Sequence, residues 1–192
     1  MEQTNIAIFA SGTGSNAEIL INYFHFNPRI NVSCVITNNP NAQVLERAKR
    51  LKVKTFVVSN SDMLLNGKIH SIFVQEDINF IVLAGYMKLI PSWIIERFKN
   101  RVINIHPALL PKFGGKGMYG NHVHEAVIAA GEKESGITIH LVNNEYDKGR
   151  ILFQATCSVS PDDTPEILAA KIHRLEHRFY PIEIESYIGK LQ

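Results

Sequence analysis

Cysteine is scarce in this sequence of 192 residues, where Cys34 and Cys157 are the only two. They stand far apart, without a CxxC pair or the spacing of zinc ligands, which excludes a disulfide framework and a cysteine-based metal site. Both lie in apolar runs, which predicts small buried thiols in a reducing compartment. We therefore expect a protein that carries no metal.

Long apolar runs and an excess of one charge are also missing. No stretch approaches the ~20 apolar residues that cross a bilayer, and Met1–Asn5 has no basic segment typical of a secretion signal. Twenty basic and 18 acidic residues leave a formal charge of +2, too weak a field to indicate nucleic acid as the main partner. These absences predict a soluble, cytoplasmic protein that binds neither nucleic acid nor a membrane.

Short apolar segments alternate with helix-like segments over the first half of the chain. The expected strands are Ile6–Ala10, Val32–Thr37, Thr55–Val58, Phe80–Ala84 and Val102–Ile105. The expected helices between them are Asn16–Phe26, Ala42–Leu51, Leu64–Val74 and Pro91–Phe98. Strands this apolar are covered on both faces, so the pattern predicts an α/β, doubly wound (Rossmann-like), mostly parallel sheet in a single domain.

The pattern changes beyond Pro107. The expected elements are a long loop to Gly120, a helix over His124–Ala130, strands over Gly136–Val142 and Arg150–Val159, and a final helix from Thr164 to about Tyr187. The two strands are expected to form a C-terminal antiparallel hairpin, and Pro181 is expected to interrupt the final helix. In such sheets ligands bind beyond the carboxyl ends of the strands, so the loops there are the ones that matter for function.

The loop Ser11–Asn16 follows the first strand and opens a helix. Its glycines let backbone N–H groups approach an anion, and the helix N-terminus adds about half a positive charge. Ser15 and Asn16 could cap the helix, and a plain capped turn is the alternative. A dinucleotide site expects an acidic residue at the end of the second strand, where this chain has Thr37-Asn38-Asn39. The loop therefore favours a mononucleotide phosphate.

The segment from Val102 to Pro107 carries the strongest chemical signal. Side chains alternate along a strand, so Asn104 and His106 project to one side, at the end where the ligand crevice is expected. An amide donor beside an imidazole suits acyl transfer, since the amide stabilises an oxyanion and the imidazole moves protons. No activated serine or cysteine stands near them, which favours a substrate amine as nucleophile.

Asp147 lies in the expected hairpin loop, with a glycine two residues later. A turn role is the ordinary interpretation. The functional one has Asp147 orient His106 and raise its pKa by favouring the imidazolium. His140, in the preceding strand, could face either the core or the site.

Three further patterns have competing interpretations. His173-Arg174-Leu175-Glu176-His177 matches the H-x-x-E-H zinc pattern, but a zinc site needs a third ligand and a match this short occurs easily by chance. His122 and His124 could hold a metal, although they are more typical of a helix start. Gly114–Gly117 lacks the context of a Walker A loop and indicates a mobile lid instead, where Lys112 or Lys116 could attract an anion.

Taken together, six segments resemble the folate-dependent formyltransferase family over nearly the whole chain. They are Ser11-Gly12-x-Gly14-Ser15-Asn16, Leu83-Ala84-Gly85-Tyr86-Met87, Asn104-Ile105-His106-Pro107-x-Leu109-Leu110-Pro111-Lys112, Gly136-Ile137-Thr138-Ile139-His140-x-Val142, Asp147 with Gly149, and Glu176-His177 with Tyr180-Pro181. The Asn-x-His-Pro segment is shared across that superfamily and related hydrolases, while the glycine loop is typical of its purine-synthesis branch.

This resemblance implies roles for three sets of residues. Catalysis would fall to Asn104, His106 and Asp147. The folate pocket would be lined by Met87, Lys88, Leu89, Ile90 and Asn104, and on its other wall by Asn143, Asn144, Glu145, Tyr146 and Asp147. The ribonucleotide would be held by Gly14, Ser15, Asn16, Pro107, His173 and Glu176. The expected single domain, 1–192, would divide into a mononucleotide-binding half, 1–101, and a folate-binding and catalytic half, 102–192.

The implied reaction is direct formyl transfer from 10-formyltetrahydrofolate, a co-substrate, to the amine of 5-phosphoribosylglycinamide in purine synthesis. Asn104 and protonated His106 would stabilise the tetrahedral oxyanion, and Asp147 would keep His106 charged and position a proton-carrying water. The protein is expected to be a monomer or a weak homodimer. Two segments depart from the family, a longer glycine-rich loop after Lys112 and Ser61-Asp62 where many members place a basic residue for the folate tail.

Several alternatives stay open. A sugar-nucleotide or other amine formyltransferase would use the same chemistry on a different amine. A methionyl-tRNA formyltransferase would carry a further C-terminal domain and a formyltetrahydrofolate hydrolase an N-terminal one, and neither is expected here. A non-catalytic nucleotide-binding protein is the alternative outside enzymes.

Overall fold

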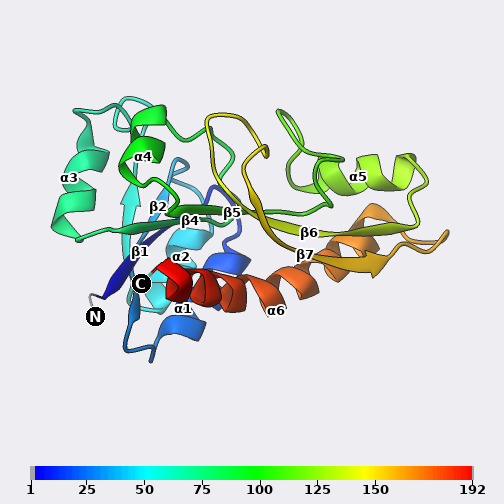
Figure 1. The fold of residues 1–192 in the computed structure, drawn as a ribbon, viewed down its shortest axis with the longest axis horizontal. Helices are drawn as coiled ribbons and strands as arrows, with labels where there is room; N and C mark the ends of the chain where they lie inside the picture. The colour runs from blue at the N-terminus through cyan, green and yellow to red at the C-terminus, as the bar shows by residue number, and fades with distance from the viewer. Residues whose placement is uncertain (1–2, 192) are drawn as a thin grey trace.

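One seven-stranded sheet forms the centre of the protein in a computed structural model that describes residues 3–191 (Figure 1). Met1, Glu2 and Gln192, which the expected domain includes, lie outside the described residues. The strands are β1 (Thr4–Phe9), β2 (Ile30–Thr37), β3 (Lys54–Val57), β4 (Phe80–Leu83), β5 (Val102–His106), β6 (Glu134–Leu141) and β7 (Ile151–Ser158). Their order is β3-β2-β1-β4-β5-β6-β7, parallel from β3 to β5 and antiparallel from β5 to β7. The predicted mostly parallel sheet with a C-terminal antiparallel hairpin is confirmed.

Helices cover both faces of this sheet. They are α1 (Ser15–Phe24), α2 (Val44–Arg50), α3 (Lys68–Gln75), α4 (Ser92–Arg97), α5 (Asn121–Ala129) and α6 (Pro165–Leu191). Buried side chains of α1, α2, α5 and α6 form one apolar cluster with the sheet, and those of α3 and α4 form a second cluster on the opposite face. Among the described residues no helix is long and apolar enough to cross a bilayer.

Alternation along β1 shows why the sheet is buried on both sides. Ile6 and Ile8 belong to the cluster under α1 and α6, while Ala7 and Phe9 belong to the cluster under α3 and α4. A strand with apolar residues at every position has no face to offer to water, so it occupies the middle of a covered sheet. β1 has β2 on one side and β4 on the other, so the strand order reverses between β1 and β4. A crevice opens at the carboxyl ends of these two strands, as is usual at such a reversal.

The final helix differs from the prediction. α6 runs without interruption from Pro165 to Leu191 with Pro181 buried inside it, so the break expected at that proline is wrong. A proline removes one backbone donor, but α6 is held at this point by Tyr180, whose buried hydroxyl donates to the Leu83 carbonyl at 2.8 Å. Thr164 does cap the helix as predicted, with its Oγ1 accepting from the Ile167 amide at 3.3 Å.

Two other helices begin later or earlier than their patterns indicated. α3 starts at Lys68 instead of Leu64, because Leu64 and Leu65 are exposed in a turn and add nothing to an apolar helix face. α5 starts at Asn121, three residues before the predicted His124.

Candidate active site

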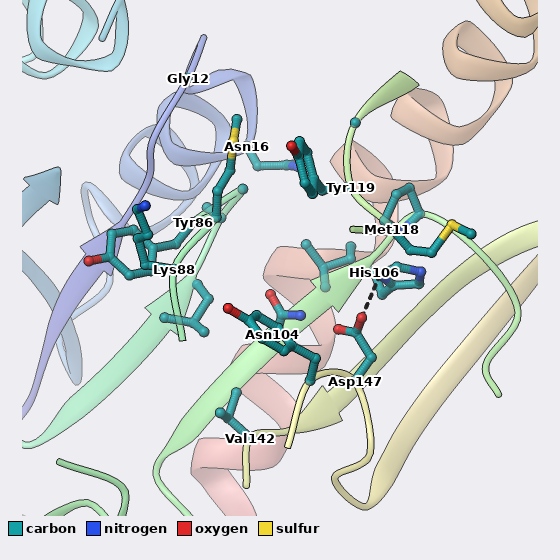
Figure 2. A pocket seen from close by; sticks show the side chains of 18 of the residues that line it. Gly12, Asn16, Tyr86, Lys88, Asn104, His106, Met118, Tyr119, Val142 and Asp147 are labelled. Atoms are coloured by element: carbon teal, nitrogen blue, oxygen red, sulfur yellow. Dashed lines mark ion pairs between the residues drawn. The ribbon is translucent and has the colours of Figure 1, made fainter. Parts of the chain in front are cut away.

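A cavity of about 660 Å³ opens at the carboxyl ends of β1, β4 and β5 (Figure 2). Its walls come from the loops after these three strands, the turn between β6 and β7, and the middle of α6. Segments far apart in the chain therefore meet around one space. That is the place where an open α/β sheet binds its ligand.

The loop between β1 and α1 presents a helix N-terminus to the cavity. Gly14 occupies the N-cap with φ +76°, and no side chain of residues 3–191 caps the helix, so the cap that Ser15 or Asn16 could have provided is not formed. A Cβ on Gly14 would lie 2.4 Å from Val44 Cγ2, so both the backbone angle and the packing of α2 require glycine here. Without a side-chain cap, the first-turn amides of α1 are left for an anion.

α6 contributes a buried carboxylate beside this loop. Glu176 Oε2 accepts a hydrogen bond from Asn16 Nδ2 at 2.9 Å, and Glu176 is only 6% exposed. Burial raises the pKa of Glu176, against the opposing effects of the Asn16 hydrogen bond and the charge of His173. Asn16, His173 and Glu176 all line the cavity, as do Gly14, Ser15 and Pro107.

β5 presents its polar face to the cavity. Asn104 and His106 both line it, while Ile103 is buried in the apolar cluster behind the strand. The imidazole of His106 is buried, and its Nε2–H donates to the Phe113 carbonyl at 2.8 Å. Its Nδ1 lies 3.6 Å from Asp147 Oδ2 (Figure 2). The predicted juxtaposition of Asn104, His106 and Asp147 therefore exists in the structure.

Asp147 sits between two imidazoles. Its Oδ1 lies 3.7 Å from His140 Nε2, and its Oδ2 accepts from the Gly115 amide at 2.9 Å. Burial alone would raise the pKa of Asp147. Its pKa is nevertheless lowered, because the carboxylate is stabilised more strongly by His140, His106 and the Gly115 amide. The carboxylate is therefore ionised at neutral pH.

The expected effect of Asp147 on His106 is only half right. Burial disfavours the imidazolium more strongly than the Asp147 carboxylate favours it. His140 adds a smaller effect in the same direction as burial. The pKa of His106 is consequently lowered, and the expectation of a raised pKa is wrong. The cause is the depth of the ring, which the sequence does not reveal.

His140 faces the cavity, a question that the sequence left open. It lies opposite Asn104 in the antiparallel pairing of β5 and β6. Its Nδ1–H donates to the Leu141 carbonyl at 2.8 Å, so in the neutral ring Nε2 accepts from Asn104 Nδ2 at 3.1 Å, whereas in the protonated ring Nε2–H would face Asp147 Oδ1 instead. This bond fixes which end of the Asn104 amide is the donor.

The segment after β4 forms another wall. Met87, Lys88, Leu89 and Ile90 all line the cavity, and the Met87 amide donates to Ser11 Oγ at 3.0 Å. Ile90 is buried, whereas Met87 and Leu89 are half exposed with apolar surface turned to the open space.

The turn between β6 and β7 is only partly at the cavity. Glu145, Tyr146 and Asp147 line it, whereas Asn143 and Asn144 are absent from its lining. Asn143 holds the turn instead, because its side chain donates to the Lys148 carbonyl and accepts from the Glu145 amide.

Residues that motif reasoning missed come mainly from the glycine-rich loop after β5. Met118 and Tyr119 line the cavity beside Lys116, which the sequence did suggest as a partner for an anion. Their loop bends at Gly115, Gly117 and Gly120, which all have positive φ. The cluster of glycines was the available signal, but it does not say which side chains the loop turns inward.

The H-x-x-E-H pattern forms no metal site in the structure. His173 and His177 stack face to face, with ring centroids 6.2 Å apart and planes 7° from parallel. Within residues 3–191 no three histidine, cysteine or carboxylate side chains lie together as metal ligands would.

Comparison with known proteins identifies a matching family model, Formyl transferase, over residues 4–184. The chain is 40% identical over 181 residues to the chloroplastic phosphoribosylglycinamide formyltransferase of Arabidopsis thaliana, covering 91% of this chain and 62% of that protein. It covers 35% of the Vigna unguiculata protein of the same name. With the Haemophilus influenzae phosphoribosylglycinamide formyltransferase it shares 34% identity, covering 97% of this chain and 89% of that protein.

Solved structures agree with this match. The phosphoribosylglycinamide formyltransferase of Bacillus halodurans superposes with a TM-score of 0.86 at 34% identity, over 98% of this chain and 97% of that one. The protein of that name from Coxiella burnetii, solved with CHES, gives 0.85 at 33% identity, over 98% and 89%.

Proposed function

Because this chain belongs to the formyl transferase family, we propose that it transfers the formyl group of 10-formyltetrahydrofolate to the amine of 5-phosphoribosylglycinamide, a step of de novo purine biosynthesis. The observation that carries the proposal is that one cavity joins a helix N-terminus suited to phosphate with Asn104, His106 and Asp147. A phosphorylated amine and a formyl donor both find suitable partners there.

The proposed chemistry is direct transfer. The amine nitrogen attacks the formyl carbon and forms the new C–N bond, and the bond from that carbon to N10 of the folate then breaks. One proton leaves the amine and one reaches N10, so the enzyme needs no nucleophile of its own. The demand on the protein is to stabilise the tetrahedral oxyanion and to carry the proton.

Asn104 supplies the first oxyanion donor. Its Nδ2 carries two hydrogens, of which one is given to His140 Nε2. The second remains for the oxyanion. Because His140 holds the amide in one orientation, this donor is in place before the reaction begins, which is what makes oxyanion stabilisation effective.

His106 would supply the second donor through Nδ1–H once the ring is protonated, because its Nε2–H is given to the Phe113 carbonyl and Asp147 Oδ2, at 3.6 Å from Nδ1, is too far for a hydrogen bond. In the free protein burial favours the neutral ring. An oxyanion beside the ring adds negative charge to that of Asp147, so His106 becomes protonated as the charge develops. Asp147 also accepts from the Gly115 amide, which ties the glycine-rich loop to the reaction centre. We propose that Asp147 positions the water that carries the proton from the amine to N10.

The two substrates would enter from opposite ends of the cavity. Gly14, Ser15 and Asn16 would hold the phosphate, with Glu176 and His173 near the ribose and phosphate and Pro107 between them and the reaction centre. Met87 to Ile90 would line the folate pocket, with Glu145 and Tyr146 opposite. Asn143 and Asn144, which stabilise or extend the turn, would act on the folate only through the position of this wall.

Many family members place a basic residue for the folate tail after β3, where this chain has Ser61-Asp62. Asp62 accepts from the amide and hydroxyl of Ser59, so its carboxylate is engaged within its own loop. Of the two lysines lining the cavity, Lys88 is on the proposed folate side, and we propose it as the cation nearest the tail carboxylates.

A transfer assay with a panel of amines tests the proposal. Purified protein is incubated with 10-formyltetrahydrofolate and, in parallel, 5-phosphoribosylglycinamide, amino-sugar nucleotides or methionyl-tRNA, and the formylated product is quantified. Preference for another amine would support formyl transfer as the reaction but reject 5-phosphoribosylglycinamide as the substrate. Binding of both ligands without transfer would indicate a non-catalytic nucleotide-binding protein. A monomer or weak homodimer, a cytoplasmic location and the two-half division of the domain stay predictions.

A further inference from the structure

The phosphate end of the cavity is built where α1 meets α6. The hydrogen bond from Asn16 to Glu176 joins the start of α1 to the middle of α6. His173 lies three residues before Glu176, about one turn earlier on the same face of the helix. It is exposed and lines the cavity together with the Gly14 loop.

Permanent positive charge is sparse around this cavity. Among the described residues that line it, the side chains that stay cationic at every physiological pH are Lys88 and Lys116. The other basic side chains of the lining are imidazoles, namely His106, His124, His140 and His173. Most basic side chains around the cavity are therefore histidines, and histidine changes its charge between pH 5 and 8.

The groups that face His173 determine which imidazole takes a proton. His177 stacks on it from α6, with Glu176 between them in sequence, and His124 faces it from α5. His124 is 3% exposed, and its Nδ1 has no hydrogen-bond partner among the described residues. Burial lowers the pKa of His124 to about 4, with further lowering by the charges of His173 and His106.

His177 is held neutral in the same way. Burial lowers its pKa, His173 lowers it further, and Glu18 on α1 opposes both. His124 and His177 therefore stay neutral near pH 7, whereas His173 is the exposed member of the three and lines the cavity. The positive end of α1 disfavours a cation here until an anion arrives.

We infer that His173 binds the substrate phosphate as an imidazolium, so that binding of a phosphorylated ribose takes up a proton from solution. The phosphate dianion would bridge the first-turn amides of α1 and the His173 ring. The anion offsets the repulsion between the helix N-terminus and the imidazolium, which makes protonation and binding mutually favourable. The inference rests on the proposed function in taking the ligand to be a phosphorylated ribose.

The expected linkage is measurable. If binding stabilises the imidazolium by the equivalent of about one pKa unit, affinity falls about tenfold in total as the pH rises through the titration of the ring. The substrate amine would titrate in the same range, so ribose 5-phosphate is the better probe. Its phosphate titrates near pH ~6, and measurements from about pH 7 to about pH 8.5 avoid that step.

Isothermal titration calorimetry in buffers of different ionisation enthalpy reports both affinity and proton uptake. Wild type should take up a fraction of a proton that declines with rising pH, while affinity falls. His173→Lys keeps the charge and should bind with no proton uptake and no pH dependence. His173→Asn should bind about threefold more weakly at pH ~7, since the full tenfold is reached only when the free ring is also protonated, and it should take up no proton.

Two controls separate His173 from its surroundings. His70→Lys places the same charge on α3, on the opposite face of the sheet, and should leave proton uptake unchanged. Lys116→Gln removes a permanent cation, so it should weaken binding without changing proton uptake. Ribose without the phosphate should bind wild type and His173→Asn equally.

The inference is overturned if wild type binds ribose 5-phosphate with no proton uptake, or if His173→Asn retains the wild-type uptake. The proposed function is judged separately, by formyl transfer in the amine panel. Proton-linked binding without transfer would reject the reaction and keep the phosphate site. Transfer without proton linkage would keep the reaction and reject the protonation of His173 on phosphate binding.

Discussion

Replacing Asn104 by alanine is the most direct test of the proposed chemistry. The substitution removes one oxyanion donor and leaves the backbone of β5 unchanged. Asn104 also donates to His140 Nε2 at 3.1 Å, so the variant leaves a buried imidazole nitrogen without its partner. The change therefore affects both catalysis and stability, and the two effects differ in size.

The catalytic effect should dominate. Loss of one donor from an oxyanion hole costs about 100- to 1,000-fold in turnover, or about 2.7–4 kcal/mol of transition-state stabilisation. Loss of the hydrogen bond to His140 costs about 1–3 kcal/mol of folding stability, which lowers Tm without unfolding most proteins of this size. KM for the amine should change little, because the proposed phosphate contacts are made elsewhere.

Single-turnover formyl transfer under saturating ligands measures the catalytic effect, and thermal unfolding measures the structural one. Asn66→Ala is the matched control, because it removes an amide from an exposed residue before α3, outside the cavity lining. A folded Asn104→Ala protein with turnover within about threefold of wild type would contradict the reasoning, since no oxyanion donor would have been lost.

Three further predictions concern pH, the glycine loop and the final helix. Burial lowers the pKa of His106, so folding favours the neutral ring. The free energy of unfolding should therefore decline as the pH falls below ~6.5. When unfolding is measured at several pH values, His106→Asn should make this decline shallower. Gly14→Ala meets a positive φ and a contact 2.4 Å from Val44, and should lower stability by about 1–3 kcal/mol in denaturant melts while weakening phosphate binding. Tyr180→Phe removes the hydroxyl that donates to the Leu83 carbonyl, and should lower stability by about 1–3 kcal/mol with little change in KM.

Local patterns in the sequence were sufficient for the parallel half of the sheet. Every residue of β4 is buried, so its apolar run identified a central strand without ambiguity. In β5 the alternation of side chains along the strand is enough to place Asn104 and His106 on one face. These features depend on neighbours within one strand, which a sequence displays directly.

Features that depend on distant segments could not be predicted in the same way. The orientation of His140 follows from its register opposite Asn104 in the pairing of β5 with β6, two strands that are joined through the long segment containing α5. The lowered pKa of His106 depends on how deeply the surrounding segments bury the ring. The unbroken course of α6 through Pro181 depends on the anchoring of its neighbour Tyr180 to β4.

The position of Asp147 shows how the antiparallel half of the sheet serves the reaction. Asp147 has φ +56°, and two residues later a Cβ on Gly149 would lie 1.6 Å from the Leu141 carbonyl oxygen. The turn can therefore fold back tightly onto β6 only with glycine at 149, and this tight return brings the carboxylate back over β5. A parallel crossover would have carried the chain away across a helix. Because β6 is antiparallel to β5, it ends beside the start of β5, with Leu141 opposite Ile103. The return of the turn over the sheet is thus what brings a carboxylate distant in sequence within 3.6 Å of the His106 ring.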